Sequence, residues 1–138
     1  MSDFKIFSHT ADIGLEVQGK TREDLFRNAA LGLLSILTDP SDFGRTETVR
    51  FKLEARTWED LLVAWLEEIL YFFTVKAIGF RDFKITSMSP TRVQGIGAGE
   101  RIDLKKHRVD REVKAVTYHD LKIEKTRTGY KTRIILDI

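Results

Sequence analysis

The sequence predicts a single α+β domain spanning residues 1–138, with two main helices packed on a mostly antiparallel β-sheet. A chain of 138 residues is long enough for one hydrophobic core with helices over a sheet. Two segments, which begin after Thr21 and Thr57, carry apolar residues at helical spacing. The other apolar segments are short and mostly consecutive along the chain, which favours antiparallel pairing over a doubly wound parallel fold.

The N-terminal part is expected to form two strands. Residues 4–7 and 13–17 have the short, partly alternating apolar pattern of strands. Residues 9–12 interrupt this pattern and are expected to connect the two strands. The connection therefore places a histidine and an aspartate at a turn.

Each predicted helix has its own start signal. Thr21 and Thr57 are each followed three residues later by an aspartate, in a pattern that resembles a capping box with Asp in place of Glu. The first helix should end at Asp39-Pro40, because proline disfavours α geometry in the residue before it. The apolar positions with helical spacing are Leu25, Phe26, Ala29, Ala30, Leu33, Leu34 and Leu37 in the first helix, and Leu61, Leu62, Trp65, Leu66, Ile69, Leu70, Phe72 and Phe73 in the second.

The remaining apolar segments indicate β structure. Residues 49–54 alternate cleanly, and further strands are expected at residues 80–86, 92–102, 112–124 and 130–137, the last two forming a hairpin. Within residues 113–119, a period of two places Lys114, Val116 and Tyr118 on one face, and Val113, Ala115, Thr117 and His119 on the other.

Three glycines, Gly95, Gly97 and Gly99, superficially suggest a phosphate-binding loop. Their spacing does not match a Walker loop or a dinucleotide loop, both of which lead into a helix with different gaps. Glycine at every second position puts all three on one face of a strand. Close packing or a bulge at that strand is the simpler explanation.

Composition and charge narrow the class of protein. The chain has no cysteine, so it can form neither disulfides nor thiolate metal sites. No stretch approaches the roughly 20 apolar residues of a membrane span, and the N-terminus lacks the layout of a secretory signal, so we expect a cytoplasmic protein without membrane contact. Residues 101–138 carry 11 basic and 6 acidic residues, which leaves direct RNA contact as a minor alternative.

Asp12, Asp137 and Ile138 are candidate ligands for a divalent metal ion. An isolated aspartate at the end of a strand is more often a turn former or a solvated residue than a ligand. Ile138, the last residue, adds an α-carboxylate beside Asp137, and three negative groups repel one another unless a cation lies between them. A hard cation such as Mg²⁺ or Ca²⁺ is therefore expected, provided that the fold brings Asp12 to Asp137.

The other polar residues give weaker evidence of a functional role. His9 could be a ligand, a hydrogen-bond partner of Asp12 or a polar turn residue, and His107 and His119 form no zinc-binding pattern with it. Lys114 is either a solvent-facing strand residue or an anchor for a phosphate or an acidic partner. No spacing indicates a nucleophilic triad, and no general base stands beside the carboxylates, which argues against a metal-dependent hydrolase.

Four segments together resemble the archease family. They are Ser-His-Thr-Ala-Asp-Ile-Gly at residues 8–14, Gly-Glu-x-x-Asp at 99–103, Val-Lys-Ala-Val-Thr-Tyr-His at 113–119 and Ile-Leu-Asp-Ile at 135–138. With the two helices included, the resemblance covers essentially the whole chain. It implies a small α+β accessory protein of RNA metabolism, with no catalytic residues of its own.

The resemblance also implies partners and a site. The expected partner is the GTP-dependent tRNA-splicing RNA ligase, whose guanylylation and multiple turnover the family promotes; a chaperone role toward a tRNA cytosine-5 methyltransferase is the alternative. By motif position, the divalent metal site falls on Asp12, Asp137 and Ile138, with Ca²⁺ favoured by the family and Mg²⁺ or Mn²⁺ as alternatives. Lys114 corresponds to a residue needed for partner activation, and His9 and His119 are candidates to support the ligands.

Overall fold

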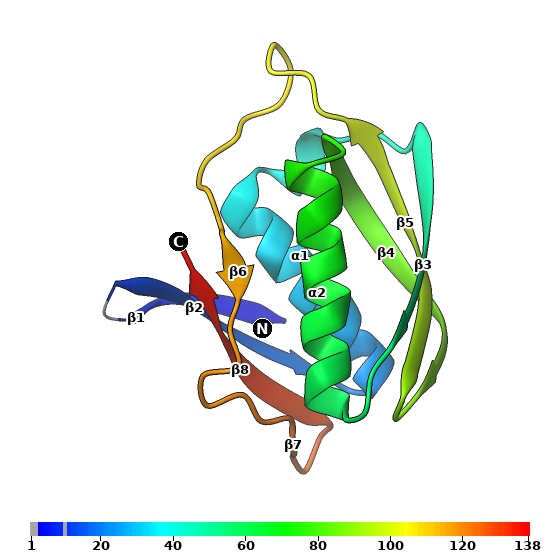
Figure 1. Ribbon diagram of the computed structural model, residues 1–138, viewed down its shortest axis with the longest axis vertical. Helices are drawn as coiled ribbons and strands as arrows, with labels where there is room; N and C mark the ends of the chain where they lie inside the picture. Colours follow the sequence, from blue (N-terminus) through cyan, green and yellow to red (C-terminus); the bar gives the residue numbers. More distant parts are fainter. Residues whose placement is uncertain (1–2, 10) are drawn as a thin grey trace.

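The computed structural model describes residues 3–9 and 11–138, and in these residues the chain folds into three layers. Two α-helices lie between two antiparallel sheets (Figure 1). Helix α1 packs against β2 of the first sheet and β4 of the second, while α2 contacts β3 and β6. Because both faces of each helix meet a sheet, one continuous core fills the interior. The predicted α+β class is confirmed.

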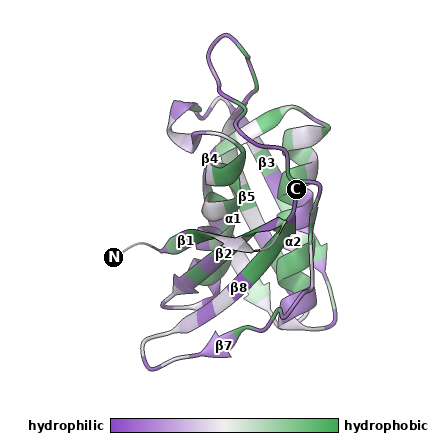
Figure 2. Cartoon of the chain, turned by 90° about the vertical axis from the view of Figure 1, so that its left-hand side faces the viewer, coloured by the Kyte–Doolittle hydropathy of each residue, from purple (hydrophilic) through white to green (hydrophobic). Residues whose placement is uncertain are grey.

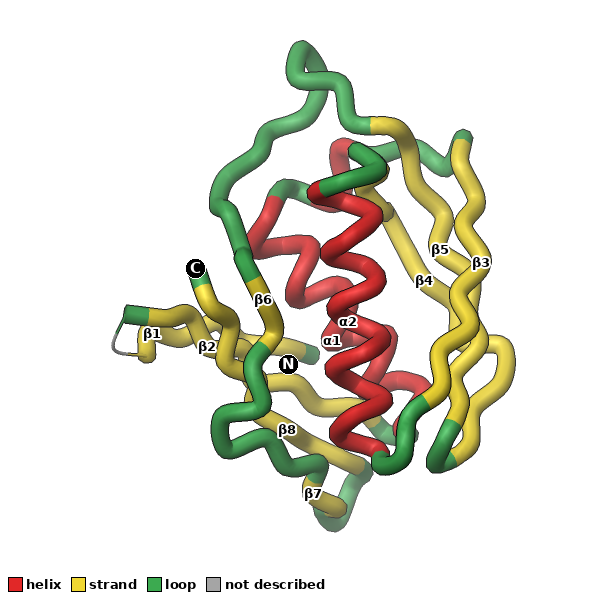
Figure 3. The backbone as a smooth tube through the Cα atoms, viewed as in Figure 1, coloured by secondary structure: helices red, strands yellow, loops and turns green. Residues whose placement is uncertain are grey.

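The first sheet joins the two ends of the chain (Figure 3). Its strand order is β1-β2-β8-β6, with β7 also paired to β8, and all these pairings are antiparallel. The strands are β1 Phe4–His9, β2 Asp12–Gly19, β6 Ala115–Val116, β7 Glu124–Lys125 and β8 Tyr130–Asp137.

The second sheet has the order β3-β5-β4 and is also antiparallel. Its strands are β3 Glu47–Glu54, β4 Ile78–Ser89 and β5 Arg92–Arg101. Gly95, Gly97 and Gly99 are buried on one face of β5, where a Cβ atom would meet Trp65, Phe80 or the backbone of Gly79. The prediction that these glycines serve close packing on a strand is confirmed.

Both helices start where the sequence predicts. Helix α1 (Arg22–Leu37) and helix α2 (Trp58–Thr74) each follow a threonine N-cap. The hydroxyl of Thr21 accepts the N–H of Asp24 at 3.0 Å, and that of Thr57 accepts the N–H of Asp60 at 3.1 Å, so each cap satisfies one of the unpaired N–H groups of the first turn. Helix α1 ends two residues before the predicted stop, and Pro40–Asp42 form the 3₁₀ helix η1.

Aromatic side chains connect the layers. Trp65 of α2 is completely buried and donates its indole N–H to the carbonyl oxygen of Phe26 in α1 at 3.0 Å. Its ring lies edge-on to Phe51 of β3 and to Phe83 of β4. Trp65 therefore connects both helices to the second sheet, and the only polar atom of its side chain is hydrogen-bonded.

The prediction of a long strand over residues 112–124 is wrong. Within residues 112–125 the strands are β6 and β7, of two residues each. Val113 and Val116 are both buried, so the predicted alternation of faces does not hold. The amide groups of this segment are divided between β8 and helix α2. Lys114 and Thr117 donate to carbonyl oxygens of β8 at 2.7 and 3.0 Å, whereas Val116 donates to Glu67 at 2.9 Å and Ile123 donates to Glu59 at 3.0 Å.

No helix in residues 3–9 and 11–138 is both long and apolar enough to cross a membrane.

Candidate functional site

The fold brings Asp12 next to the end of β8. Strands β2 and β8 are paired as far as Ile13 and Leu136, so Asp12 and Asp137 occupy the next facing positions of this antiparallel ladder. Residues that face each other in such a ladder project to the same side of the sheet. Asp12 and Asp137 therefore lie at adjacent ends of two paired strands.

Asp12 and Ile138 line one pocket. It has a volume of about 390 Å³ and is bordered by the β1–β2 hairpin, the last residue of the chain and Arg111. Arg111, which belongs to the long connection between β5 and β6, was not predicted from the sequence. No motif marked it, because its place in the pocket depends on the path of that connection.

Lys114 lies beside Asp137. Its backbone N–H donates to the carbonyl oxygen of Asp137 at 2.7 Å, and the next residue, Ala115, pairs with Asp137 in the ladder. The side chain of Lys114 is exposed. Lys114 and the two aspartates thus come from three different strand ends at one corner of the first sheet.

The two candidate histidines differ in position. The backbone of His9 closes β1 and pairs with Asp12, but its side chain lies outside the described residues. His119 follows β6 on a loop, and its Nε2 atom is 3.2 Å from the carboxylate of Asp120. Asp120 lines a different groove, together with Lys131 and Arg133 of β8.

The donor chemistry of this corner suits a hard cation. Aspartate and main-chain oxygens are the ligands that Ca²⁺ and Mg²⁺ prefer. Among the described residues, no group of three or more His, Cys, Asp or Glu side chains could hold a metal ion, so such a site depends on two aspartates and on Ile138. Arg111, a fixed positive charge in the same pocket, would compete with a cation there. The metal site stays a prediction.

Comparison with known proteins identifies the family. The family model described as "Archease protein family (MTH1598/TM1083)" matches residues 4–138. The chain belongs to the archease family. The chain is 37% identical to "Protein archease" of Methanosarcina barkeri, covering 98% of this chain and 95% of the relative. It is also 37% identical to "Protein archease" of Saccharolobus solfataricus, with both chains covered completely.

A solved structure supports the same fold. The solution structure of Methanobacterium thermoautotrophicum protein 1598 superposes with a TM-score of 0.82, at 31% identity, over 100% of both chains. The two helices and the mostly antiparallel sheets of this archease therefore match a measured structure in the arrangement of their elements.

The Gly-Glu-x-x-Asp segment of this archease organises a loop rather than the pocket. The carboxylate of Glu100 accepts hydrogen bonds from Lys106 at 2.6 Å and from the N–H of Gly44 at 2.9 Å. These two bonds, with a further one from His107, lower the pKa of Glu100 to about 2. The Nδ1 atom of His107 accepts the N–H of Asp103 at 2.9 Å, so Nε2 is the donor to Glu100, 3.2 Å away.

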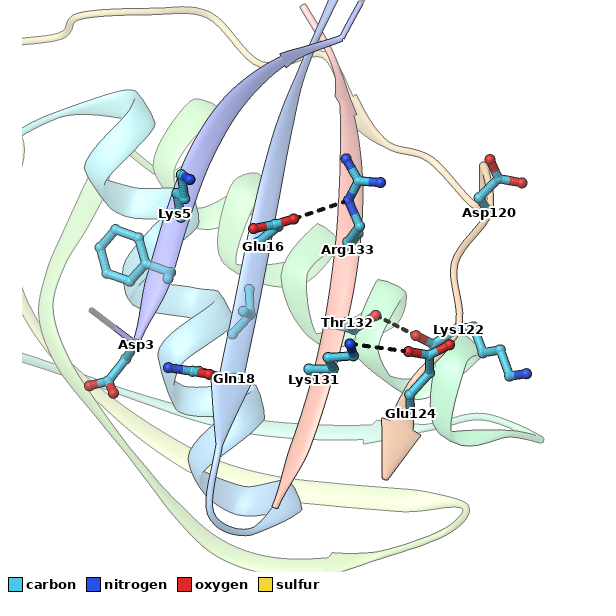
Figure 4. Close-up of a pocket in the computed structure, with 12 residues that line it drawn as sticks. Asp3, Lys5, Glu16, Gln18, Asp120, Lys122, Glu124, Lys131, Thr132 and Arg133 are labelled. Carbon is cyan, nitrogen blue, oxygen red and sulfur yellow. Dashed lines mark hydrogen bonds and ion pairs between the residues drawn. The ribbon is translucent and has the colours of Figure 1, made fainter. Parts of the chain in front are cut away.

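A larger groove runs along the outer face of the first sheet. It has a volume of about 680 Å³ and lies between β1 and residues 120–124 (Figure 4). Half of its charged residues are paired within it: Arg133 lies 3.5 Å from Glu16, and Lys131 lies 3.8 Å from Glu124. Because the lining contains four basic and four acidic residues, the groove favours neither cationic nor anionic ligands. These residues are Asp3, Lys5, Glu16, Asp120, Lys122, Glu124, Lys131 and Arg133.

Proposed function

We propose that this archease is a cytoplasmic accessory protein that activates the GTP-dependent tRNA-splicing RNA ligase by promoting its guanylylation and multiple turnover. One observation carries the proposal: the pairing of β2 with β8 sets Asp12 beside Asp137, and the backbone of Lys114 is bonded to Asp137. Two carboxylates and an exposed lysine at one corner suit contact with phosphates and metal ions at a partner's active site. Membership of the archease family supports this choice of partner.

In this proposal a divalent metal ion is held by Asp12, Asp137 and Ile138. Ca²⁺ is favoured by the family resemblance, and Mg²⁺ and Mn²⁺ are the alternatives. The ion would supply positive charge beside a phosphate group. Lys114 adds a mobile cation at the rim, able to bind a phosphate oxygen or a carboxylate of the ligase. The archease contributes positioning and electrostatics, while the ligase carries out the covalent chemistry.

The test measures guanylylation of the ligase with labelled GTP, with and without archease. Asp12→Ala, Asp137→Ala and Lys114→Ala should each reduce the stimulation by about 10-fold or more, because each removes a charge aimed at the reacting groups. Asp42→Ala and Lys52→Ala are matched controls at exposed positions outside this corner, and should stimulate normally. Normal stimulation by all three site variants, with folding verified by circular dichroism, would eliminate the proposal.

A protein-binding chaperone for a tRNA cytosine-5 methyltransferase is the second candidate. The observation that favours it is the exposure of several large apolar side chains, among them Leu104 at 77% and Tyr118 at 58%. Suppression of methyltransferase aggregation, measured by light scattering, should then survive Asp12→Ala and decline with polar substitutions of the exposed residues. Loss of suppression with Asp12→Ala alone would count against this alternative.

A further inference from the structure

The connection between β5 and β6, residues 102–114, protrudes from one end of the molecule (Figure 1). It is nevertheless firmly attached to the fold. His107 is 3% exposed, and its ring stacks on Phe43 with centroids 3.8 Å apart and an interplanar angle of 5°. Val113 is buried at the far end of the segment.

Backbone contacts complete this attachment. The hydroxyl of Thr38 donates to the carbonyl oxygen of Arg108, and the N–H of Asp110 donates to the carbonyl oxygen of Leu37 at 2.8 Å. Leu37 and Thr38, which make these two bonds, both lie at the C-terminal end of α1. The segment is therefore fixed to α1 and to η1, and the side chains that point outward are presented in a defined arrangement.

Two of those outward side chains are aliphatic. Leu104 is 77% exposed and Val109 is 51% exposed. The other exposed residues of the segment are charged (Figure 2). Leu104 lies between Asp103 and Lys105, and Val109 lies between Arg108 and Asp110, whose side chains form an ion pair at 2.9 Å. The segment contains five basic and three acidic residues, so its net charge is +2. Single exposed apolar residues are normal, but two on one fixed loop with a net positive charge make a pattern suited to binding.

The segment is continuous with the proposed site. Arg111 lines the pocket that contains Asp12 and Ile138, and Lys114 ends the segment beside Asp137. Whatever binds Leu104 and Val109 is therefore brought close to the carboxylates. A docking surface at this position would orient the candidate site against its partner.

We propose that residues 102–114 form a docking element, in which Leu104 and Val109 enter an apolar depression on a partner protein whose border carries carboxylates. The inference rests on the proposed function, so the partner is the RNA ligase. The aliphatic side chains favour a protein over RNA, because a phosphate backbone offers no apolar surface for them, whereas an anchor residue in a pocket surrounded by charges is typical of protein interfaces.

The test uses the double variant Leu104→Ser/Val109→Ser and measures ligase binding by surface plasmon resonance. The affinity should fall by about 10-fold or more, because two anchoring side chains are removed. Tyr118→Ser is the matched control: this residue is 58% exposed and follows β6 on a different loop, and its loss should leave the affinity unchanged. A Lys105→Glu/Arg108→Glu variant should slow association, since the charges steer the encounter.

Activation assays separate this inference from the proposed function. The double variant should need about 10-fold more archease for half-maximal guanylylation but should reach the normal maximum, whereas Asp12→Ala should lower the maximum. Unchanged affinity in the double variant overturns the docking element while the activation stands. If wild-type archease neither binds nor stimulates the ligase, the proposed function and the docking element both fail.

A second binding measurement tests whether residues 102–114 bind RNA instead of a protein. A fluorescein-labelled tRNA half, titrated with archease, reports direct RNA contact. Weaker RNA binding by Lys105→Glu/Arg108→Glu, combined with unchanged ligase binding by Leu104→Ser/Val109→Ser, would overturn the docking element in favour of an RNA-binding segment.

Discussion

At the scale of single residues, the hydrogen bonds of Glu100 fix the start of segment 102–114. Its carboxylate has a pKa of about 2 instead of the usual 4.5, first because of the hydrogen bond from Lys106 and then because of the N–H of Gly44. Since the folded-state pKa is the lower one, the ionised carboxylate stabilises the fold fully above pH 4.5, and this contribution is lost as the pH falls toward 2.

Glu100→Gln should therefore destabilise the protein in a pH-dependent way. The difference in free energy of unfolding between wild type and Glu100→Gln should be largest near pH 7 and should shrink by about pH 3. Urea denaturation at both pH values measures it. Glu23→Gln, an exposed position in the first turn of α1, is the control. A difference that stays constant with pH would show that ionisation of Glu100 contributes nothing.

Gly99 shows how closely the second sheet is packed. A Cβ atom at this position would overlap the carbonyl oxygen of Gly79, a backbone atom of the neighbouring strand. Gly99→Ala should reduce the free energy of unfolding by about 2 kcal/mol or more, because the strands must separate. Gly44→Ala is the matched control, since its nearest neighbour would be the carboxylate of Glu100 at 3.5 Å. Equal stability of both variants would contradict this packing.

At the scale of elements, helix α2 holds the C-terminal segment in place. The carboxylate of Glu67 accepts the N–H of Val116, at the strand β6 that neighbours the candidate site. Glu67→Ala should cost about 1 kcal/mol in unfolding free energy, because a half-buried N–H loses a charged acceptor, and should speed hydrogen exchange at the Val116 amide. Glu68→Ala, one residue later on the same helix, should change neither. Unaltered exchange in Glu67→Ala would show that water replaces the carboxylate at no cost.

The same contact explains what the sequence could and could not predict at this scale. The starts of both helices could be predicted from Thr21 and Thr57, because an N-cap is a local interaction between residues three positions apart. Residues 112–124 looked like a strand because their apolar residues are β-branched and frequent. The amides of Val116 and Ile123 instead bond to Glu67 and Glu59, which lie 49 and 64 residues away in the sequence, and no local pattern contains that information.

At the scale of the whole molecule, the sequence predicted the fold class but not the layering. Alternation identifies which face of a strand is buried, not which element covers it, so the position of both helices between two sheets had to come from the structure. The sequence marked Asp12 and Asp137 as candidate ligands at strand ends, but their proximity depends on the pairing of β2 with β8, which the sequence did not predict. The presence of Arg111 in the pocket of Asp12 and Ile138 could not be predicted either, since it depends on the path of the long connection between β5 and β6.

The proposed metal site would join the β1–β2 hairpin to the end of β8, so metal binding should stabilise the whole fold. Ca²⁺ at about 100 times its Kd should raise the free energy of unfolding by about 2.7 kcal/mol, since only the folded chain holds Asp12 beside Asp137. Differential scanning calorimetry with Ca²⁺, Mg²⁺ or Mn²⁺, and again after chelation, measures the shift. Asp12→Asn and Asp137→Asn should abolish it, Asp42→Asn should retain it, and Arg111→Ala should increase it by removing a competing cation. A Tm that no divalent ion changes would contradict a metal site at this corner.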